Sequence, residues 1–121
     1  YAEMGGQSGD IGLITGVNGL FAVANPKSPY TGLTLHWGKM NGGFLSLQEG
    51  VEAEIDIVNR RKIEKNHSAT HLLHYALWQV LGEHVKQAGS LVEGERFRFD
   101  FSHHKALSPD EIAQIETIVN T

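Results

Sequence analysis

The hydrophobic repeat of this chain changes once, within residues 51–82, which read VEAEIDIVNRRKIEKNHSATHLLHYALWQVLG. Apolar and acidic residues alternate from Val51 to Val58, which is the two-residue period of a half-buried β-strand. After Asn59 apolar residues recur about every 3.6 positions, which predicts a helix ending at Gly82. They cover roughly half of the helix circumference, so we expect the helix to pack on a sheet. The change of period therefore predicts an α+β fold.

The part before this helix has the pattern of an all-β module. Eleven of the fourteen glycines lie there, and glycine, proline and asparagine separate short apolar stretches. These stretches are Ile11–Thr15, Leu20–Ala24, Leu33–Trp37 and Phe44–Gln48. Strands this short are typical of a small barrel or sandwich. We therefore predict a β-barrel-like module over residues 1–58.

The part after the long helix predicts a hairpin and a second helix. Ser90–Val92 and Glu95–Phe101 flank a Glu-Gly turn, and phenylalanine alternates with charged residues along the second of these strands. Ser108 and Glu111 stand three residues apart in the pattern of a capping box, which predicts a helix that starts there. Residues 59–121 are thus expected to form a second unit, a long helix packed on an antiparallel sheet.

Composition excludes several classes of protein. The chain has 121 residues, a formal net charge of −4 and 40% hydrophobic residues, which excludes disordered and collagen-like chains. Cysteine is absent, so any metal site must use histidine and carboxylate ligands. No apolar run is long enough to span a membrane and no leader pattern is present, so we expect a cytoplasmic protein without membrane contact. Tyr1 in place of Met, and Thr121 directly after a helical pattern, predict a piece of a longer protein.

Four basic residues gather where the long helix is expected to begin. They are Arg60, Arg61, Lys62 and Lys65. Such a run is either the solvated start of a helix or a patch that faces phosphates. The net negative charge of the chain argues against general nucleic-acid binding, but it allows a local contact with one RNA backbone.

Three histidines form a stripe on the predicted long helix. His67 and His71 are four residues apart and His74 is three further on, so all three lie within about 60° of helix surface. Two imidazoles at this spacing can bind one zinc ion, or they can be a purely structural pair. Ser68 stands where a metalloprotease has glutamate, which argues against a peptidase. Buried imidazoles need partners, so the stripe predicts a lined cavity.

The other polar candidates have simpler interpretations from sequence. His36, His84 and the pair His103-His104 are expected to be ordinary loop histidines. Gln87 and Ser90 fall in the turn region before the hairpin, where they either form the turn or recognise a polar substrate. The glycine-rich run from residue 3 to 10 lacks the lysine of a P-loop, so we expect a tight turn that brings backbone close to another element.

Several motifs in a fixed order resemble one known family. They are Asn66-His67-Ser68-Ala69-Thr70-His71-Leu72-Leu73-His74, Gln87-Ala88-Gly89-Ser90-Leu91-Val92 and Arg96-Phe97-Arg98-Phe99-Asp100-Phe101-Ser102-His103, with an opening Tyr1-Ala2-Glu3-Met4-Gly5-Gly6-Gln7-Ser8-Gly9-Asp10. Together they resemble the editing domain of alanyl-tRNA synthetases, preceded by that family's small β-barrel. The resemblance covers almost the whole chain. The resemblance implies hydrolysis of seryl- or glycyl-tRNA(Ala). It also implies that tRNA(Ala) is a partner and that DNA is not.

The resemblance also implies site residues. His67 and His71 would be the first two zinc ligands, and a cysteine and a histidine would follow in a downstream Cys-x-x-x-His segment that this sequence lacks. Gln87 matches a glutamine of the editing pocket and is the predicted catalytic and substrate-binding residue. Ser68, which keeps the hydroxyl of a frequent threonine, and Ser90 are the other predicted substrate-binding residues. ATP and magnesium would serve only a catalytic domain that this chain does not contain.

Two other interpretations stay open at this stage. The chain could be a freestanding trans-editing deacylase of the same superfamily, or a non-catalytic tRNA-binding module. Since two imidazoles are half of a tetrahedral zinc site, we also expect this chain to bind zinc weakly or not at all.

Overall fold

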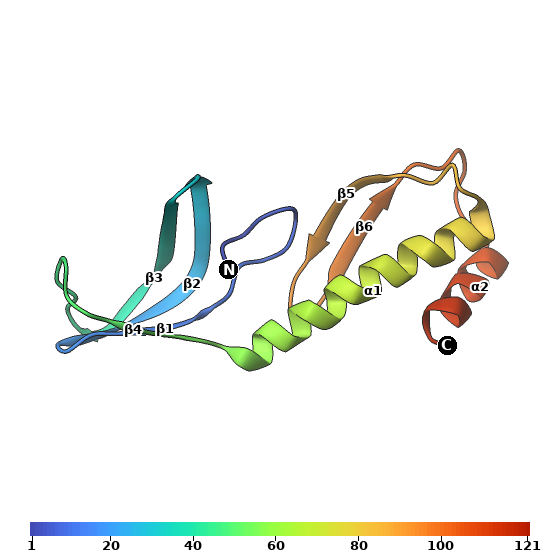
Figure 1. The fold of residues 1–121 in the computed structure, drawn as a ribbon. Helices are drawn as coiled ribbons and strands as arrows, with labels where there is room; N and C mark the ends of the chain where they lie inside the picture. Colours follow the sequence, from blue (N-terminus) through green and yellow to red (C-terminus); the bar gives the residue numbers. More distant parts are fainter.

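The structure is a computed structural model that describes residues 1–121 and contains six strands and two helices (Figure 1). In chain order they are β1 (Gly12–Thr15), β2 (Gly19–Tyr30), β3 (Leu33–Gly43), β4 (Glu52–Ile55), α1 (Ile57–Leu81), β5 (Gln87–Val92), β6 (Phe97–Phe101) and α2 (Pro109–Val119). The predicted α+β class is confirmed. Figure 1 shows the first four strands at one end of an elongated molecule and the hairpin with both helices at the other. Neither helix is both long enough and apolar enough to cross a membrane.

The first four strands form an open antiparallel sheet in the order β3-β2-β1-β4. The closed barrel expected from the sequence is therefore wrong. The sequence predicts a further strand at Phe44–Gln48, but this segment forms a loop after β3. Without that strand nothing pairs β3 with β4, and both stay sheet edges. β2 and β3 instead run longer than predicted, because their hairpin continues pairing out to Tyr30 and Leu33.

The boundary between the strand and the long helix differs from the prediction. The strand over Val51–Val58 shortens to β4, and α1 begins at Ile57 rather than after Asn59. The cause is Asp56, whose side chain accepts a hydrogen bond from the backbone N–H of Asn59 at 3.0 Å and caps the helix. The strand is also exposed along its whole length, at the edge of the sheet. The predicted helix end is confirmed, with Gly82 at the C-cap.

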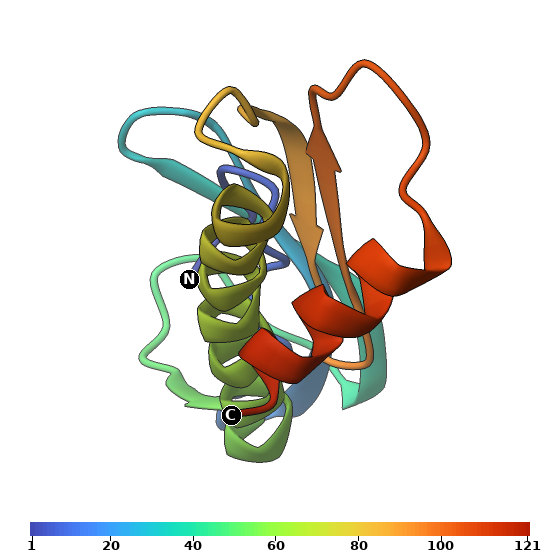
Figure 2. The same cartoon turned by 90° about the vertical axis from the view of Figure 1, so that its right-hand side faces the viewer.

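The main hydrophobic core cluster lies in the second half of the chain, and Val23 of β2 is a separate buried residue in the first half. The buried centre of the main cluster is Ala76, Leu77, Val85 and Ile115. Phenylalanines of β6 and apolar residues of α1 and α2 pack around it. Figure 2 shows α2 crossing α1, while the β5–β6 hairpin lies beside α1. The predicted packing of the long helix on a hairpin is confirmed, and α2 closes the other side of the core.

The start of α2 matches the predicted capping box. The Ser108 side chain accepts the Glu111 N–H at 3.2 Å, and the Glu111 carboxylate accepts the Ser108 N–H at 2.8 Å. Pro109 takes the first helical position, where a missing N–H costs nothing. This end of the helix is thus determined by local sequence.

The glycine-rich N-terminal segment docks on the hairpin. Gly6 has φ +82° and its carbonyl accepts the Val92 N–H at 2.8 Å, while the Ser8 N–H donates to the Val92 carbonyl at 2.9 Å. A Cβ on Gly6 would collide with the Ser90 carbonyl, so glycine is required for this close approach. The expected tight turn against another element is confirmed. Arg60 adds a second tie, since its guanidinium lies 2.8 Å from the buried carboxylate of Asp10.

Candidate functional site

Two histidines of α1 face each other at the side of the helix nearest the N-terminal segment. The Nε2 atoms of His67 and His71 are 3.2 Å apart. Two imidazoles bound to one tetrahedral zinc at about 2.0–2.1 Å hold their nitrogens about 3.3–3.4 Å apart. The two nitrogens are therefore about as far apart as two ligands of one zinc ion, and the pair could supply half of a tetrahedral ligand set.

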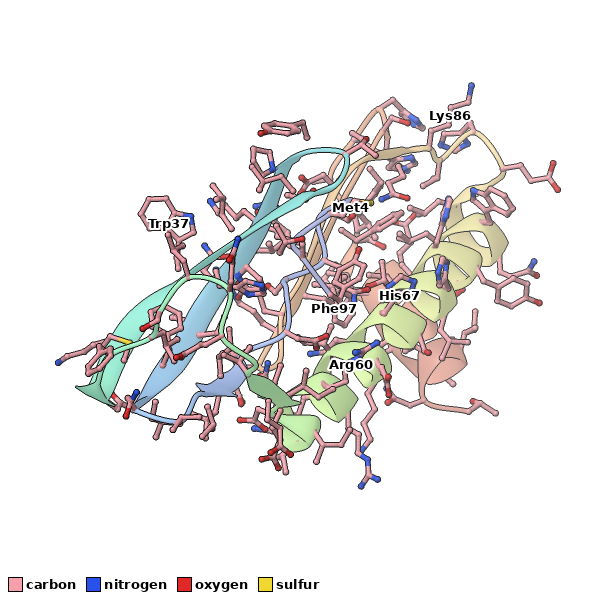
Figure 3. All side chains as sticks on the ribbon, turned by 60° about the vertical axis from the view of Figure 1, so that its left-hand side comes forward. Met4, Trp37, Arg60, His67, Lys86 and Phe97 are labelled. Carbon is pink, nitrogen blue, oxygen red and sulfur yellow. The ribbon has the colours of Figure 1, made fainter.

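Gln7 orients one of these rings. Its side-chain oxygen accepts a hydrogen bond from Nδ1 of His67 at 2.8 Å (Figure 3 labels His67). An oxygen acceptor at Nδ1 places the ring proton there and leaves the lone pair of Nε2 directed at His71. This is the arrangement in which metal-binding histidines are usually held by their surroundings. Gln7 lies 60 positions from His67, so periodicity along the chain gave no signal for it.

A small cavity lies beside the histidine stripe, as predicted, and has a volume of about 120 Å³. It is lined by Gly5, Gln7, His67, Thr70, His71, His74, Gln87, Ser90, Val92 and Phe99. Pockets for drug-sized ligands are about 300–1,000 Å³, so this cavity suits only a small chemical group. Gln87 and Ser90 both face it, but they lie in strand β5 rather than in a turn. Pairing of Gln87 with Phe101 extends the strand back to that residue.

Ser68 is the one predicted site residue that the structure does not bring to the cavity. It is exposed on another side of α1, in a shallow groove with Arg61 and Lys65. One helical step of about 100° turns it away from His67. Thr70, three residues after His67, is buried and lines the cavity instead, and its hydroxyl donates to the Asn66 carbonyl at 2.8 Å. Helical spacing alone was enough to find Thr70.

His74 contributes an unpartnered polar atom to the cavity. Its Nε2 is buried and has no hydrogen-bond partner. The ring packs against Trp78 and Phe99, with centroid distances of 4.7 and 5.0 Å. A buried polar atom without a partner is costly unless a ligand completes it. The cavity thus offers an acceptor or donor to a small polar group.

Two of the four residues of the predicted basic run are engaged in ion pairs. Arg60 contacts Asp10 and Glu64, and Lys62 contacts Glu95. The hydrogen bond and negative charge of Glu95 raise the pKa of Lys62. Arg61 and Lys65 form no ion pair, so they are the two basic residues of this run that stay available for phosphates.

Three of the histidines expected to be ordinary loop residues lie together. His84, His103 and His104 form a cluster at the end of α1, and only His36 of that set stays isolated, on β3. The sequence could not show this cluster because its members come from two loops that meet only in the folded chain.

Comparison with known proteins adds the class of enzyme. The chain matches a segment of aminoacyl-tRNA ligases, and these ligases are specific for alanine. Over 120 residues, 99% of this chain, it is 52% identical to the alanine–tRNA ligase of Fervidobacterium nodosum, 49% to that of Chlamydia muridarum and 47% to that of Chloroflexus aurantiacus. It spans 13–14% of the length of these relatives. No family profile matches the chain. The predicted resemblance to alanyl-tRNA synthetase is confirmed.

Proposed function

We propose that this chain carries the editing site of an alanyl-tRNA synthetase, which hydrolyses seryl- or glycyl-tRNA(Ala). The observation that supports it best is the cavity itself. A histidine pair with facing nitrogens, the amide of Gln87 and the hydroxyl of Ser90 surround a space of about 120 Å³. That space suits an aminoacyl group as small as serine or glycine.

A second, hydrolytic site is needed because the site that selects alanine discriminates poorly against similar amino acids. A pocket built for alanine cannot strongly reject glycine, which is smaller, or serine, which adds only a hydroxyl. Selective hydrolysis of the wrong product at a second site supplies the missing discrimination. The second site requires polar groups that recognise the added hydroxyl, and Thr70, His74 and Ser90 place such groups around the cavity.

The reaction adds one water across the ester. The water oxygen bonds to the carbonyl carbon, the bond from that carbon to the ribose oxygen breaks, and a water proton passes to the ribose oxygen. In this proposal His67 and His71 hold the zinc ion, which when bound polarises a carbonyl or lowers the pKa of a water. Gln87 orients the aminoacyl group for attack. The RNA partner is tRNA(Ala), and the proposed location of the reaction is the cytoplasm. ATP and magnesium would serve the ligase reaction elsewhere in the protein.

The two alternative interpretations have less support. Identity of 45% or more to alanine–tRNA ligases over almost the whole chain favours a synthetase segment over a freestanding deacylase. A non-catalytic tRNA-binding module would have no use for a lined cavity holding a histidine pair. Both alternatives remain outcomes of the experiment below.

The proposal is tested in a full-length synthetase that contains this segment. The variant His67→Ala/His71→Ala is expected to lose roughly 100-fold or more of its seryl-tRNA(Ala) deacylation, because the metal site supplies several kcal/mol of transition-state stabilisation. Its alanine-charging rate and its circular dichroism should stay unchanged. His36→Ala, an exposed histidine of β3, is the matched control and should edit normally.

A second variant separates the roles within the site. Gln87→Ala should slow deacylation while the amount of bound zinc stays at the wild-type level. Full deacylation by a folded His67→Ala/His71→Ala variant would overturn the site assignment and leave the histidine pair as a structural feature. If the wild type showed no deacylation at all and the His67→Ala/His71→Ala variant lost tRNA binding, the tRNA-binding module would be favoured.

A further inference from the structure

Two loops meet at the end of α1 that is farthest from the N-terminal sheet. The turn after α1 carries His84, and the connection from β6 to α2 carries His103 and His104. Figures 1 and 2 both show these loops at the same end of the molecule. Backbone bonds fix them together, since the Ser102 N–H donates to the Lys86 carbonyl at 3.0 Å and the Lys86 N–H donates to the Ser102 hydroxyl oxygen at 3.1 Å.

The three imidazoles converge. One ring nitrogen from each of His84, His103 and His104 lies within 4.8 Å of the other two. Nε2 of His84 and Nδ1 of His103 are 2.8 Å apart, and the ring centroids of His103 and His104 are 4.5 Å apart. Three ligands to one tetrahedral zinc would have their nitrogens about 3.3–3.4 Å apart, which lies between the 2.8 Å of the His84–His103 pair and the 4.8 Å limit of the whole cluster.

The cluster contains a ring nitrogen that has no hydrogen-bond partner in the protein. Nε2 of His103 is buried and has no hydrogen-bond partner. None of the three histidines forms an ion pair with a carboxylate. Imidazole nitrogens that are gathered without an ion-paired carboxylate are available as ligands to a metal ion.

We propose that His84, His103 and His104 form a second metal site, which binds zinc or another divalent late first-row transition metal. Imidazole is a preferred ligand for these ions, and three of them leave a fourth position for water or a further group. The site is distinct from the editing cavity, because none of its three histidines lines that cavity. It does not depend on the proposed editing function.

A metal ion there would stabilise this half of the fold. It would join the turn after α1 to the connection that leads into α2, and thereby hold α2 on the core. The expectation that this chain binds zinc weakly considered only His67 and His71. The tertiary structure adds three further histidines, so for the chain as a whole the proposal predicts tighter zinc binding than that expectation, which stays a prediction.

The test uses the 121-residue chain and zinc alone, with affinity measured by competition against a chelating dye. The variant His67→Ala/His71→Ala should keep one zinc per chain with the parental affinity. The variant His84→Ala/His104→Ala should bind zinc at least tenfold more weakly than the parent, since one imidazole cannot hold the ion. His36→Ala is the matched control and should bind as the parent does.

Two further measurements keep the test decisive. Zinc should raise the Tm of the parent and of His67→Ala/His71→Ala, but not that of His84→Ala/His104→Ala. Cobalt bound to the parent should give the intense visible spectrum of a four-coordinate ion. If the double variant does not fold, His104→Ala alone, at an exposed position, should still weaken zinc binding tenfold. Unchanged zinc affinity in either of these variants, or no zinc bound by the parent at equimolar concentration, would overturn the proposal.

Discussion

At the scale of single residues, the editing cavity depends on contacts between positions far apart in the chain. Gln7 reaches His67 across 60 positions and sets which ring nitrogen carries the proton. Gly6 permits this by bringing the N-terminal segment against the Ser90 carbonyl with a positive φ. Side chains that hold a metal-binding histidine are commonly worth about 10–100-fold in metal affinity.

Replacement of Gln7 is therefore expected to weaken the metal site without destroying the fold. In the full-length synthetase, Gln7→Ala should lower the affinity of the His67–His71 site for zinc about tenfold, because Nδ1 of His67 loses its acceptor and the ring can rotate. Gln7→Glu keeps an oxygen acceptor and should restore most of the affinity. Zinc competition measures both, and Gln79→Ala, at an exposed position on α1, is the control. Equal affinity in Gln7→Ala and wild type would show that His67 needs no orienting partner.

At the scale of elements, the start of α2 is determined locally by its capping box. The hydrogen bond from the Ser108 backbone to the carboxylate lowers the pKa of Glu111 below its ordinary value. A carboxyl group with a depressed folded-state pKa binds protons less readily in the folded chain than in the unfolded one. It therefore stabilises the fold above the unfolded pKa of about 4.5, and this contribution is lost as the pH falls through the folded-state value.

The variant Glu111→Gln should remove this pH-dependent contribution. The gap in unfolding free energy between wild type and Glu111→Gln is expected to be constant at neutral pH and to shrink as the pH falls below about 4.5. Urea titrations at a series of pH values measure it. Glu116→Gln, an exposed glutamate farther along α2, tests whether any loss of a glutamate gives the same profile. A gap that grew on acidification would contradict the assigned sign.

At the scale of the whole molecule, stability is concentrated in one half. The buried core joins α1, α2 and the segment before β5, whereas the four-stranded sheet leaves about half of its apolar side chains exposed. Burial of Leu77 leaves it 2% exposed, while Leu47, in the loop after β3, is 97% exposed. The same residue type thus occurs in both environments.

This difference predicts the effect of truncating each leucine. Leu77→Ala should reduce the free energy of unfolding by about 2–5 kcal/mol, the usual cost of a large-to-small change in a core. Leu47→Ala should change it by no more than about 0.5 kcal/mol, since an exposed side chain loses little on truncation. Denaturant unfolding followed by circular dichroism compares them. Similar losses in both variants would mean that the sheet loop is packed as tightly as the core.

The sequence alone determined those features that depend on neighbours within a few positions. The 3.6-residue repeat and Gly82 predicted α1 and its end, the alternating phenylalanines predicted the β5–β6 hairpin, and Ser108 predicted the start of α2. The motifs predicted the resemblance that the comparisons confirm. Helical spacing also predicted the histidine stripe and its cavity, because residues three and four apart share one face of a helix.

Only the tertiary structure decided what depends on long-range contacts. The predicted division at residue 58 stays a prediction, but the sheet is open because pairing between β3 and β4 requires a strand that does not form. The place of Ser68 outside the cavity, the support of His67 by Gln7, and the meeting of His84 with His103 each depend on which segments pack together. Periodicity reports the face on which a residue lies; packing decides what that face contacts.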